Sequence, residues 1–236
     1  NSLSGCFPQP AAKGLILRRV VWDRSRRRQI EFPTAESDIV VADIDLLTNW
    51  ADKSKVRHPL AWEIMRESGV NAHFAFTIRV EQNGQFFSTA DFVEDGDDIY
   101  LERAGLNPDG AMYKVYSNRL NKDKGDTGYS GVEKKNRKSE NNDDLQALID
   151  GLDLTGADLE NYMRDNLDIP KTINMLAANS VIRNIDMHRK NWYIYRDTGK
   201  TDEWSILPWD LDLSQGRTWN RQNTYFDNNV YTNGLV

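Results

Sequence analysis

The sequence predicts an α+β fold that is strand-rich in its first part and mainly helical in its second. Residues 74–80 and 86–93 alternate apolar and polar side chains around Asn83-Gly84, a strong signal for a type I′ hairpin. After Pro170, which suits a first helical turn, apolar side chains recur at helical spacing. They are Ile173, Leu176, Ala177 and Val181. At 236 residues, the chain can form one larger domain or two small ones.

Composition excludes several classes of protein. The chain is 39% hydrophobic and 28% charged, enough for a hydrophobic core, and no run approaches the ~20 apolar residues of a membrane span. Its net charge of −6 argues against general affinity for nucleic acid. The single cysteine, Cys6, allows no internal disulfide. Because the chain starts without Met and ends abruptly, we expect it to be a fragment of a longer protein.

A basic segment lies near the N-terminus. Residues 13–28 hold seven Lys and Arg side chains against one acid, Asp23. Such a segment can bind an anionic surface, or it can be a strand whose charged face is in solvent. We favour the second interpretation.

A pattern of polar side chains near the C-terminus carries the chemistry. Asp186 follows the helix that begins at Pro170, and Asn191 comes five residues later. Residues 192–195 and 204–207 read as two strands joined by a turn at 197–202. The second strand leads directly into Asp210 and Asp212.

This order of residues suits phosphoryl transfer. Divalent cations that bridge nucleotide phosphates prefer hard oxygen ligands. Protein kinases supply an Asn from the catalytic loop and an Asp after a strand, and a second Asp, five residues before the Asn, accepts the substrate's proton. Asp186, Asn191 and Asp210 match that spacing. In the alternative, these residues only cap and turn a helix–hairpin junction, which leaves unexplained why apolar strands deliver two carboxylates side by side.

Two segments carry a family resemblance. Residues 184–197 read N-I-D-M-H-R-K-N-W-Y-I-Y-R-D, and residues 204–216 read W-S-I-L-P-W-D-L-D-L-S-Q-G. Both resemble the catalytic core of the CotH kinase family of atypical protein kinases. Upstream, residues 50–69 resemble its D-x-S-x-x-R helix, and residues 110–115 resemble its L-Y-K stretch. Residues 76–87 resemble its N-G hairpin, and residues 92–95 the Glu that follows it. The resemblance covers most of residues 45–216.

The resemblance implies a kinase-like fold of two lobes. Residues 1–95 would form an incomplete, strand-rich N-lobe, and residues 96–236 a mainly helical C-lobe with the catalytic loop and the metal-binding hairpin. The implied reaction transfers the γ-phosphate of ATP to Ser or Thr of a protein substrate, with Mg²⁺ or Mn²⁺. The implied location is extracellular or at a cell or spore surface. The physiological substrate and the oligomeric state are not given by the sequence.

The resemblance also assigns roles to the acidic residues. Asp186 would be the base that accepts the hydroxyl proton, and Asn191 and Asp210 would be metal ligands. Asp212 would be an auxiliary metal ligand, or it would position one of the metal ligands without binding the metal itself.

The phosphate-binding base departs from the family pattern. Where the family has a Lys-bearing strand, this chain has Arg26 and Arg27, and Arg differs from Lys in reach. No Gly-rich phosphate loop precedes them. Glu63 or Glu67, on the predicted helix at 50–69, would pair with this base. A solvated position on the helix surface is the alternative for each.

Three further residues are candidates for nucleotide contact. Glu94 lies where the chain would cross between lobes, so the backbone around it would meet the adenine. Lys114 and His188 would approach phosphate. Ordinary surface positions are the alternative for all three.

Other functions remain open. The departures at the phosphate base suit a pseudokinase or a nucleotide-binding scaffold. Another alternative is a non-catalytic surface module whose acidic cluster binds Ca²⁺. His188, Asp186 and Asp210 could instead bind zinc, but Asn191 would then have no role.

Overall fold

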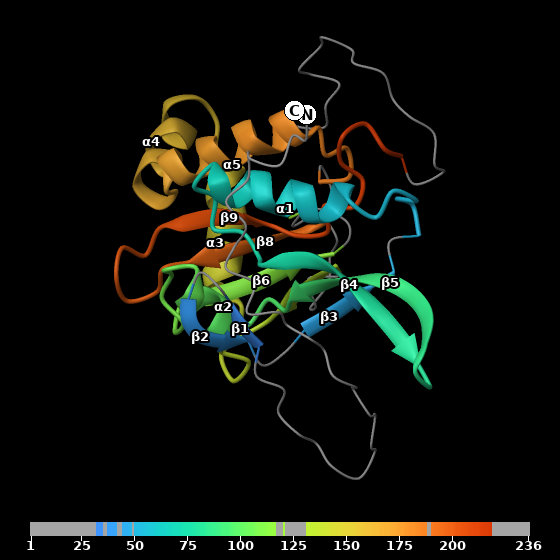
Figure 1. Ribbon diagram of the computed structural model, residues 1–236. Coiled ribbons are helices and arrows are strands. Elements are labelled where there is room, and N and C mark those ends of the chain that lie inside the picture. Colours follow the sequence, from blue (N-terminus) through green and yellow to red (C-terminus); the bar gives the residue numbers. More distant parts are fainter. Residues whose placement is uncertain are drawn as a thin grey trace.

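The computed structural model describes residues 32–34, 37–41, 44–48, 50–116, 120, 131–187 and 190–218 (Figure 1). Within these residues the chain forms antiparallel sheets and helices, which confirms the predicted α+β class. Short strands β1, Phe32–Thr34, and β2, Ser37–Val41, pair with each other.

A three-stranded sheet is built around the predicted hairpin. Its order is β3-β5-β4, with β3 at Ile44–Leu47, β4 at Ala75–Gln82 and β5 at Gln85–Glu94. Asn83 and Gly84 both have positive φ, 54° and 77°, as a type I′ turn requires. The hairpin prediction is therefore confirmed.

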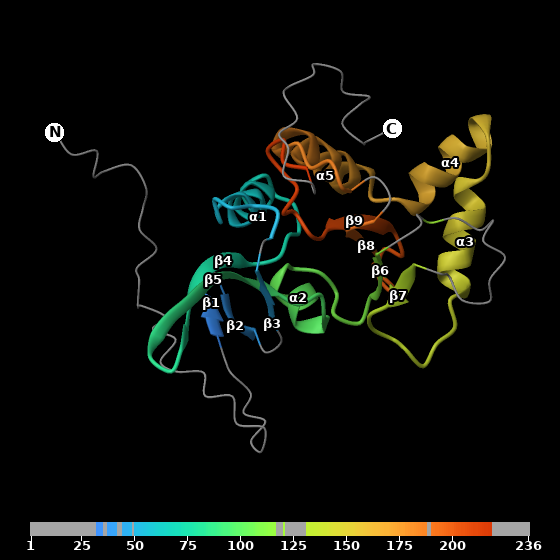
Figure 2. The same cartoon turned by 90° about the vertical axis from the view of Figure 1, so that its right-hand side faces the viewer.

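Two helices lie side by side next to this sheet. Helix α1, Arg57–Glu67, contacts both β4 and helix α5, Ile169–Ile182 (Figure 2). A shorter helix, α2, Asp98–Arg103, follows β5 and connects this part of the fold to the second sheet.

The second sheet has four strands in the order β7-β6-β8-β9. Strands β8, Trp192–Arg196, and β9, Trp204–Pro208, are the predicted hairpin. Strand β6, Ala111–Val115, lies beside β8, and β7, Val132–Lys134, pairs with β6. Residues 117–144 are polar and rich in Gly, Asn and Lys, a composition that predicts a long loop or an insertion. Strand β7 corrects this prediction, because it pairs with β6 in the sheet.

Helices α3, Asp143–Leu152, and α4, Gly156–Asn166, contact each other beside the four-stranded sheet (Figure 2). Leu145 and Leu148 of α3 pack with Tyr113 and Ile194 in a hydrophobic cluster on one face of that sheet.

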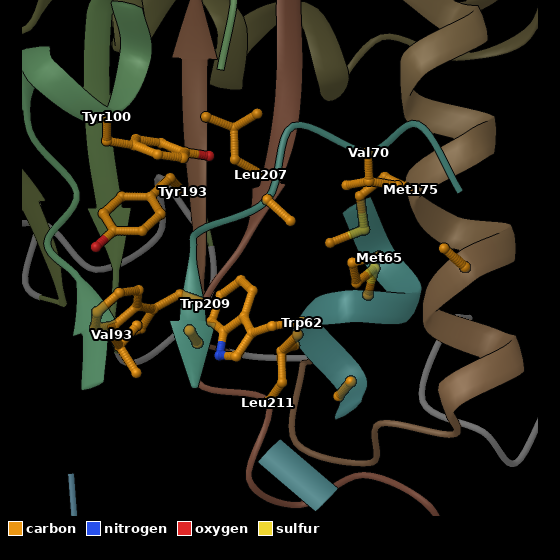
Figure 3. Packing of buried hydrophobic residues seen from close by; sticks show 14 of the residues in the cluster. Trp62, Met65, Val70, Val93, Tyr100, Met175, Tyr193, Leu207, Trp209 and Leu211 are labelled. Carbon is orange, nitrogen blue, oxygen red and sulfur yellow. The ribbon is translucent and has the colours of Figure 1, made fainter. Parts of the chain in front are cut away.

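The main hydrophobic core joins elements on both sides of residue 95. Trp62 and Met65 of α1 pack in one cluster with Met175 of α5, Tyr193 of β8 and Trp209, just after β9 (Figure 3). This shared core fixes the loop after α5 and the end of β9 against α1.

The buried faces of two helices differ from the predictions. On α1, the helical spacing of Leu60, Ile64 and Met65 predicts one apolar face, but Leu60 is exposed while His58 and Trp62 are fully buried. On α5, the predicted face is wrong. Ile173 and Val181 are 61% and 74% exposed, and the helix buries Met175, Ala178, Asn179 and Ile182 instead. Apolar side chains occur around the whole of α5, so spacing alone did not select the face.

Among the helices described, none combines the length and the apolar character needed to cross a membrane.

Candidate active site

The structure brings Asp186 and Asn191 into direct contact. Arg183 follows the last residue of α5 and has a left-handed φ of 50°. Asn184 Oδ1 then accepts a hydrogen bond from Asp186 N at 3.1 Å. Asn191 Nδ2 donates to Asp186 Oδ2 at 2.7 Å. Lys190 Nζ lies 3.1 Å from the same oxygen. The loop therefore closes on itself and presents one carboxylate, one amide and one ammonium together.

Backbone hydrogen bonds hold this loop against the end of β9. Trp209 N donates to Asn191 O at 3.2 Å, and Ile185 N donates to Leu213 O at 3.3 Å. Asn191 N donates to Val115 O of β6 at 2.8 Å. The segment that carries Asp210 is therefore fixed beside the loop that carries Asp186.

Asn191 and Asp210 share an unusual backbone conformation. Their φ angles are 67° and 53°, in the left-handed region that few non-glycine residues adopt. Such conformations persist only where surrounding structure enforces them, and they concentrate at functional sites. Both residues expected to bind a metal are thus held in this conformation at the base of the hairpin, as Asp202 is in its turn.

The carboxylates of this site are crowded. Burial, followed by the neighbouring charge of Asp210, raises the pKa of Asp212 to about 7, while His58 opposes the shift. A hydrogen bond to Asp210 and the charge of Asp186 raise the pKa further. Asp186, Asp210 and Asp212 therefore form one acidic cluster, which we call the acidic site.

The donor chemistry of the acidic site fits a hard divalent cation. Asn191 Nδ2 donates a hydrogen bond to Asp186, so the amide oxygen of Asn191 can bind a metal. Asp210 offers carboxylate oxygens. Mg²⁺ is usually held by one or two carboxylates together with substrate phosphates and water. Among the residues described, no three His, Cys, Asp or Glu side chains form a metal-binding group by themselves. A site that needs phosphate oxygens to complete its ligands does not require such a group.

Comparison with known proteins identifies the family. A family model described as CotH kinase protein matches residues 19–234. The chain belongs to the CotH kinase protein family. It is also 27% identical over 187 residues to the inner spore coat protein H of Bacillus subtilis (strain 168), covering 74% of this chain. The chain spans about half the length of that relative, 50%.

The D-x-S-x-x-R segment of this CotH family chain is a structural cap. The fully buried Asp52 carboxylate accepts hydrogen bonds from Ser54 N, Ser54 Oγ, Val56 N, Arg57 N and Arg57 Nη1. Burial alone would raise its pKa, but the hydrogen bonds from Ser54 and Arg57 lower it to about 2. By residue type, Ser54 or Asp52 could cap the helix that follows. Val56 occupies the N-cap position, and it is Asp52 that satisfies N–H groups at the start of α1.

The glutamates predicted to serve the nucleotide lie in two different settings. Glu63 and Glu67 are on the exposed face of α1, the solvated position that we named as the alternative. Glu94 is buried and bound by Arg103, with Nη2 to Oε2 at 2.6 Å and Nε to Oε1 at 2.7 Å. Its Oε2 also accepts from Phe74 N at 3.1 Å. The Glu94 carboxylate thus stabilises the fold through Arg103 and Phe74 N. Contact between the adjacent backbone and a nucleotide stays a prediction.

Lys114 lies close to the acidic site. Its Nζ is 4.2 Å from the ring centroid of Trp209, the residue before Asp210. Burial, and then the charge of Lys135, lowers its pKa. The other predicted phosphate ligands, Arg26, Arg27 and His188, lie outside the residues described.

Sequence reasoning missed a buried histidine near the acidic site. His58 Nε2 accepts from Trp62 Nε1 at 2.9 Å, and its Nδ1 is 3.1 Å from Asp91 Oδ2. The Trp62 bond therefore makes Nδ1 the protonated nitrogen, which donates to Asp91. The helical i, i+4 spacing of His58 and Trp62 was the available signal, but the Asp91 partner is 33 residues away.

Proposed function

We propose that this chain is an atypical protein kinase that transfers the γ-phosphate of ATP to Ser or Thr of a protein. The observation that carries the proposal is the contact of Asp186 with Asn191 at 2.7 Å beside Asp210 and Asp212. Membership of the CotH kinase protein family supports the same reaction class.

The residues of the acidic site would divide the reaction between them. Asp186 would accept the proton of the substrate hydroxyl. At the same time the hydroxyl oxygen would bond to the γ-phosphorus, and the bond from that phosphorus to the ADP oxygen would break. Lys190 and Asn191 hold the Asp186 carboxylate in place through its Oδ2. Asn191 and Asp210 would hold Mg²⁺ or Mn²⁺, with Asp212 supporting Asp210. The bound metal would neutralise charge on the phosphates.

The proposal extends to the arrangement of the chain. Residues 1–95 and 96–236 would act as two lobes, and the backbone after Glu94 would contact the adenine. Lys114 would supply a positive charge for phosphate. By analogy with the spore coat relative, we propose association with a spore surface and a protein substrate there.

A phosphate-transfer assay tests the proposal. Purified chain is incubated with γ-labelled ATP, Mg²⁺ or Mn²⁺ and dephosphorylated casein as a general Ser/Thr acceptor. Asp186→Asn should lower the rate on the order of 10²-fold or more, because proton transfer is lost. Asp158→Asn, on the exposed first turn of α4, is the matched control and should retain the wild-type rate. An undiminished rate in Asp186→Asn would rule out this base, and ATP binding without any transfer would favour a pseudokinase.

A further inference from the structure

A second lysine lies beside Lys114, on a part of the chain with no motif. Lys135 follows β7, and its N donates to Met112 O of β6 at 2.8 Å. Lys134 pairs with Tyr113 in the antiparallel register of β6 and β7. Lys135 is therefore opposite Met112 and faces the same side of the sheet as Lys114, because side chains alternate along a strand.

The two lysines influence each other. Lys135 is the first charge that lowers the pKa of Lys114. Both also act on the buried His73. The two ammonium groups therefore repel each other, and repulsion between like charges is stronger where solvent is restricted.

Few counter-charges face these lysines. Lys135 Nζ is 3.8 Å from Asp95 Oδ2, a long ion pair in which Lys135 is 17% exposed. Lys114 has no carboxylate within ion-pair distance among the residues that the structure describes, although Asp95, Asp45 and Glu133 act on it from farther away. Lys114 instead packs over Trp209 and, at 5.8 Å, Tyr193.

The Asp95 side of this group is tightly packed. Gly96 lies so close to Tyr193 that a side chain there would meet the Tyr193 hydroxyl at 2.4 Å. Figure 3 shows Tyr193 and Trp209 as neighbours in the core. The segment from Asp95 to Gly96 is therefore held against β8 at the level of Lys114, one residue along the chain from Glu94.

We propose that Lys114 and Lys135 form a two-lysine cradle for the phosphate chain of a nucleoside triphosphate, and that Asp95 competes with the nucleotide for Lys135. This inference rests on the proposed function and names the cationic residues of the same site. The cradle would supply, next to Asp210, the positive charge for the phosphates. In the family pattern, a Lys on an N-terminal strand supplies this charge. When the nucleotide binds, Lys135 exchanges the Asp95 carboxylate for phosphate oxygens.

Calorimetric titration of the chain with ATP and Mg²⁺, at fixed ionic strength, tests the cradle. Lys135→Gln should weaken ATP binding about tenfold or more, as expected for the loss of a hydrogen bond between charged groups. Asp95→Asn should tighten ATP binding severalfold, because Lys135 loses its competitor. Lys138→Gln, on an exposed position three residues along the same loop, is the matched control and should bind as the wild type does.

Opposite shifts separate this role from a structural one. If the Lys135–Asp95 ion pair only stabilised the fold, both variants would weaken binding together, and that result overturns the proposal. Adenosine, which lacks phosphate, should bind Lys135→Gln and wild type equally, and Lys135→Arg should restore much of the ATP affinity. If Lys135→Gln does not fold, the Lys135→Arg and Asp95→Asn titrations still decide the outcome.

The outcomes also separate this inference from the proposed function. If Lys135→Gln binds ATP as tightly as the wild type does, the cradle alone is overturned. If Lys135→Gln binds ATP more weakly and the wild type transfers no phosphate, the kinase activity is overturned and the cradle is supported. Wild type that does not bind ATP overturns both.

Discussion

Asp52 and Asp212 are both carboxylates withdrawn from solvent, but their surroundings are opposite. Asp52 is encircled by donors from Ser54, Val56 and Arg57, and its pKa is lowered to about 2. Asp212 is surrounded by other carboxylates, and its pKa is raised to about 7. The fold stabilises the ionised form of Asp52 and disfavours the ionised form of Asp212. The comparison teaches that Asp52 serves the structure, whereas the crowded carboxylates of the acidic site suit the cation that we propose for it.

The largest expected effect is on catalysis. Asp210→Ala should lower the rate of phosphate transfer on the order of 10²-fold or more, because the charge on the phosphates would lose its metal. The free energy of unfolding should change little, because Asp210 lies beside the carboxylates of Asp186 and Asp212, which accept hydrogen bonds and cannot stabilise its charge. Parallel rate measurements and urea unfolding check both expectations. Loss of folding together with activity would mean that the acidic site is structural, as Asp52 is.

Removal of the cap should act in the opposite way. Asp52→Ala should lower the free energy of unfolding by about 2–3 kcal/mol, because the start of α1 and Arg57 lose their acceptor. Urea unfolding measures this change, with Asp158→Ala as a control expected to shift it by less than ~0.5 kcal/mol. An Asp52→Ala variant as stable as the control would show that the five hydrogen bonds contribute little.

The pH dependence of stability gives a finer test of the cap. The folded chain lowers the pKa of Asp52 from 3.8 to about 2, so the folded state favours the ionised carboxylate. Its contribution, about 2 kcal/mol, is complete above pH ~4 and is lost as the pH falls toward 2. Unfolding of wild type and Asp52→Asn should therefore differ least at the acid end. A difference that grows as the pH falls would contradict the assignment.

The smallest expected effect is a gain in stability. Asp212→Asn should raise the free energy of unfolding of the metal-free chain by about 1 kcal/mol at pH 8, because it removes the cost of burying an ionised carboxylate and relieves repulsion from Asp210 and Asp186. Addition of ATP and Mg²⁺ should remove this advantage. Thermal unfolding with and without these ligands measures both. A destabilised Asp212→Asn would show that this carboxylate makes favourable contacts instead.

Local signals predicted the hairpin and the position of the residues around it, whereas their roles stay predictions. The strands at 192–195 and 204–207, the turn between them and the contact of Asp186 with Asn191 all depend on residues close in sequence. Alternation, turn chemistry and loop length are sufficient at this range, so the structure confirms the hairpin and brings the predicted residues together.

Features that depend on distant segments were predicted poorly. The outward side chains of α5 are as apolar as its buried ones, so only packing against α1 and β9 selects the face that holds Asn179. Lys135 was read as part of a long loop, because three-residue strand β7 is defined by its pairing with β6 rather than by its own sequence. Both errors come from tertiary contacts that override local pattern.

The acidic site is tested most directly by thermal unfolding of the chain with ATP and Mg²⁺, compared with the Asp210→Ala variant. Ligand at 100 times its dissociation constant adds about 2.7 kcal/mol, which raises the melting temperature of a chain of this size by several degrees. We predict that shift in the wild type, dependent on both ATP and the metal, and its loss in Asp210→Ala. A wild type that melts at the same temperature with and without ATP and Mg²⁺, or an Asp210→Ala variant that keeps the full shift, would contradict the account.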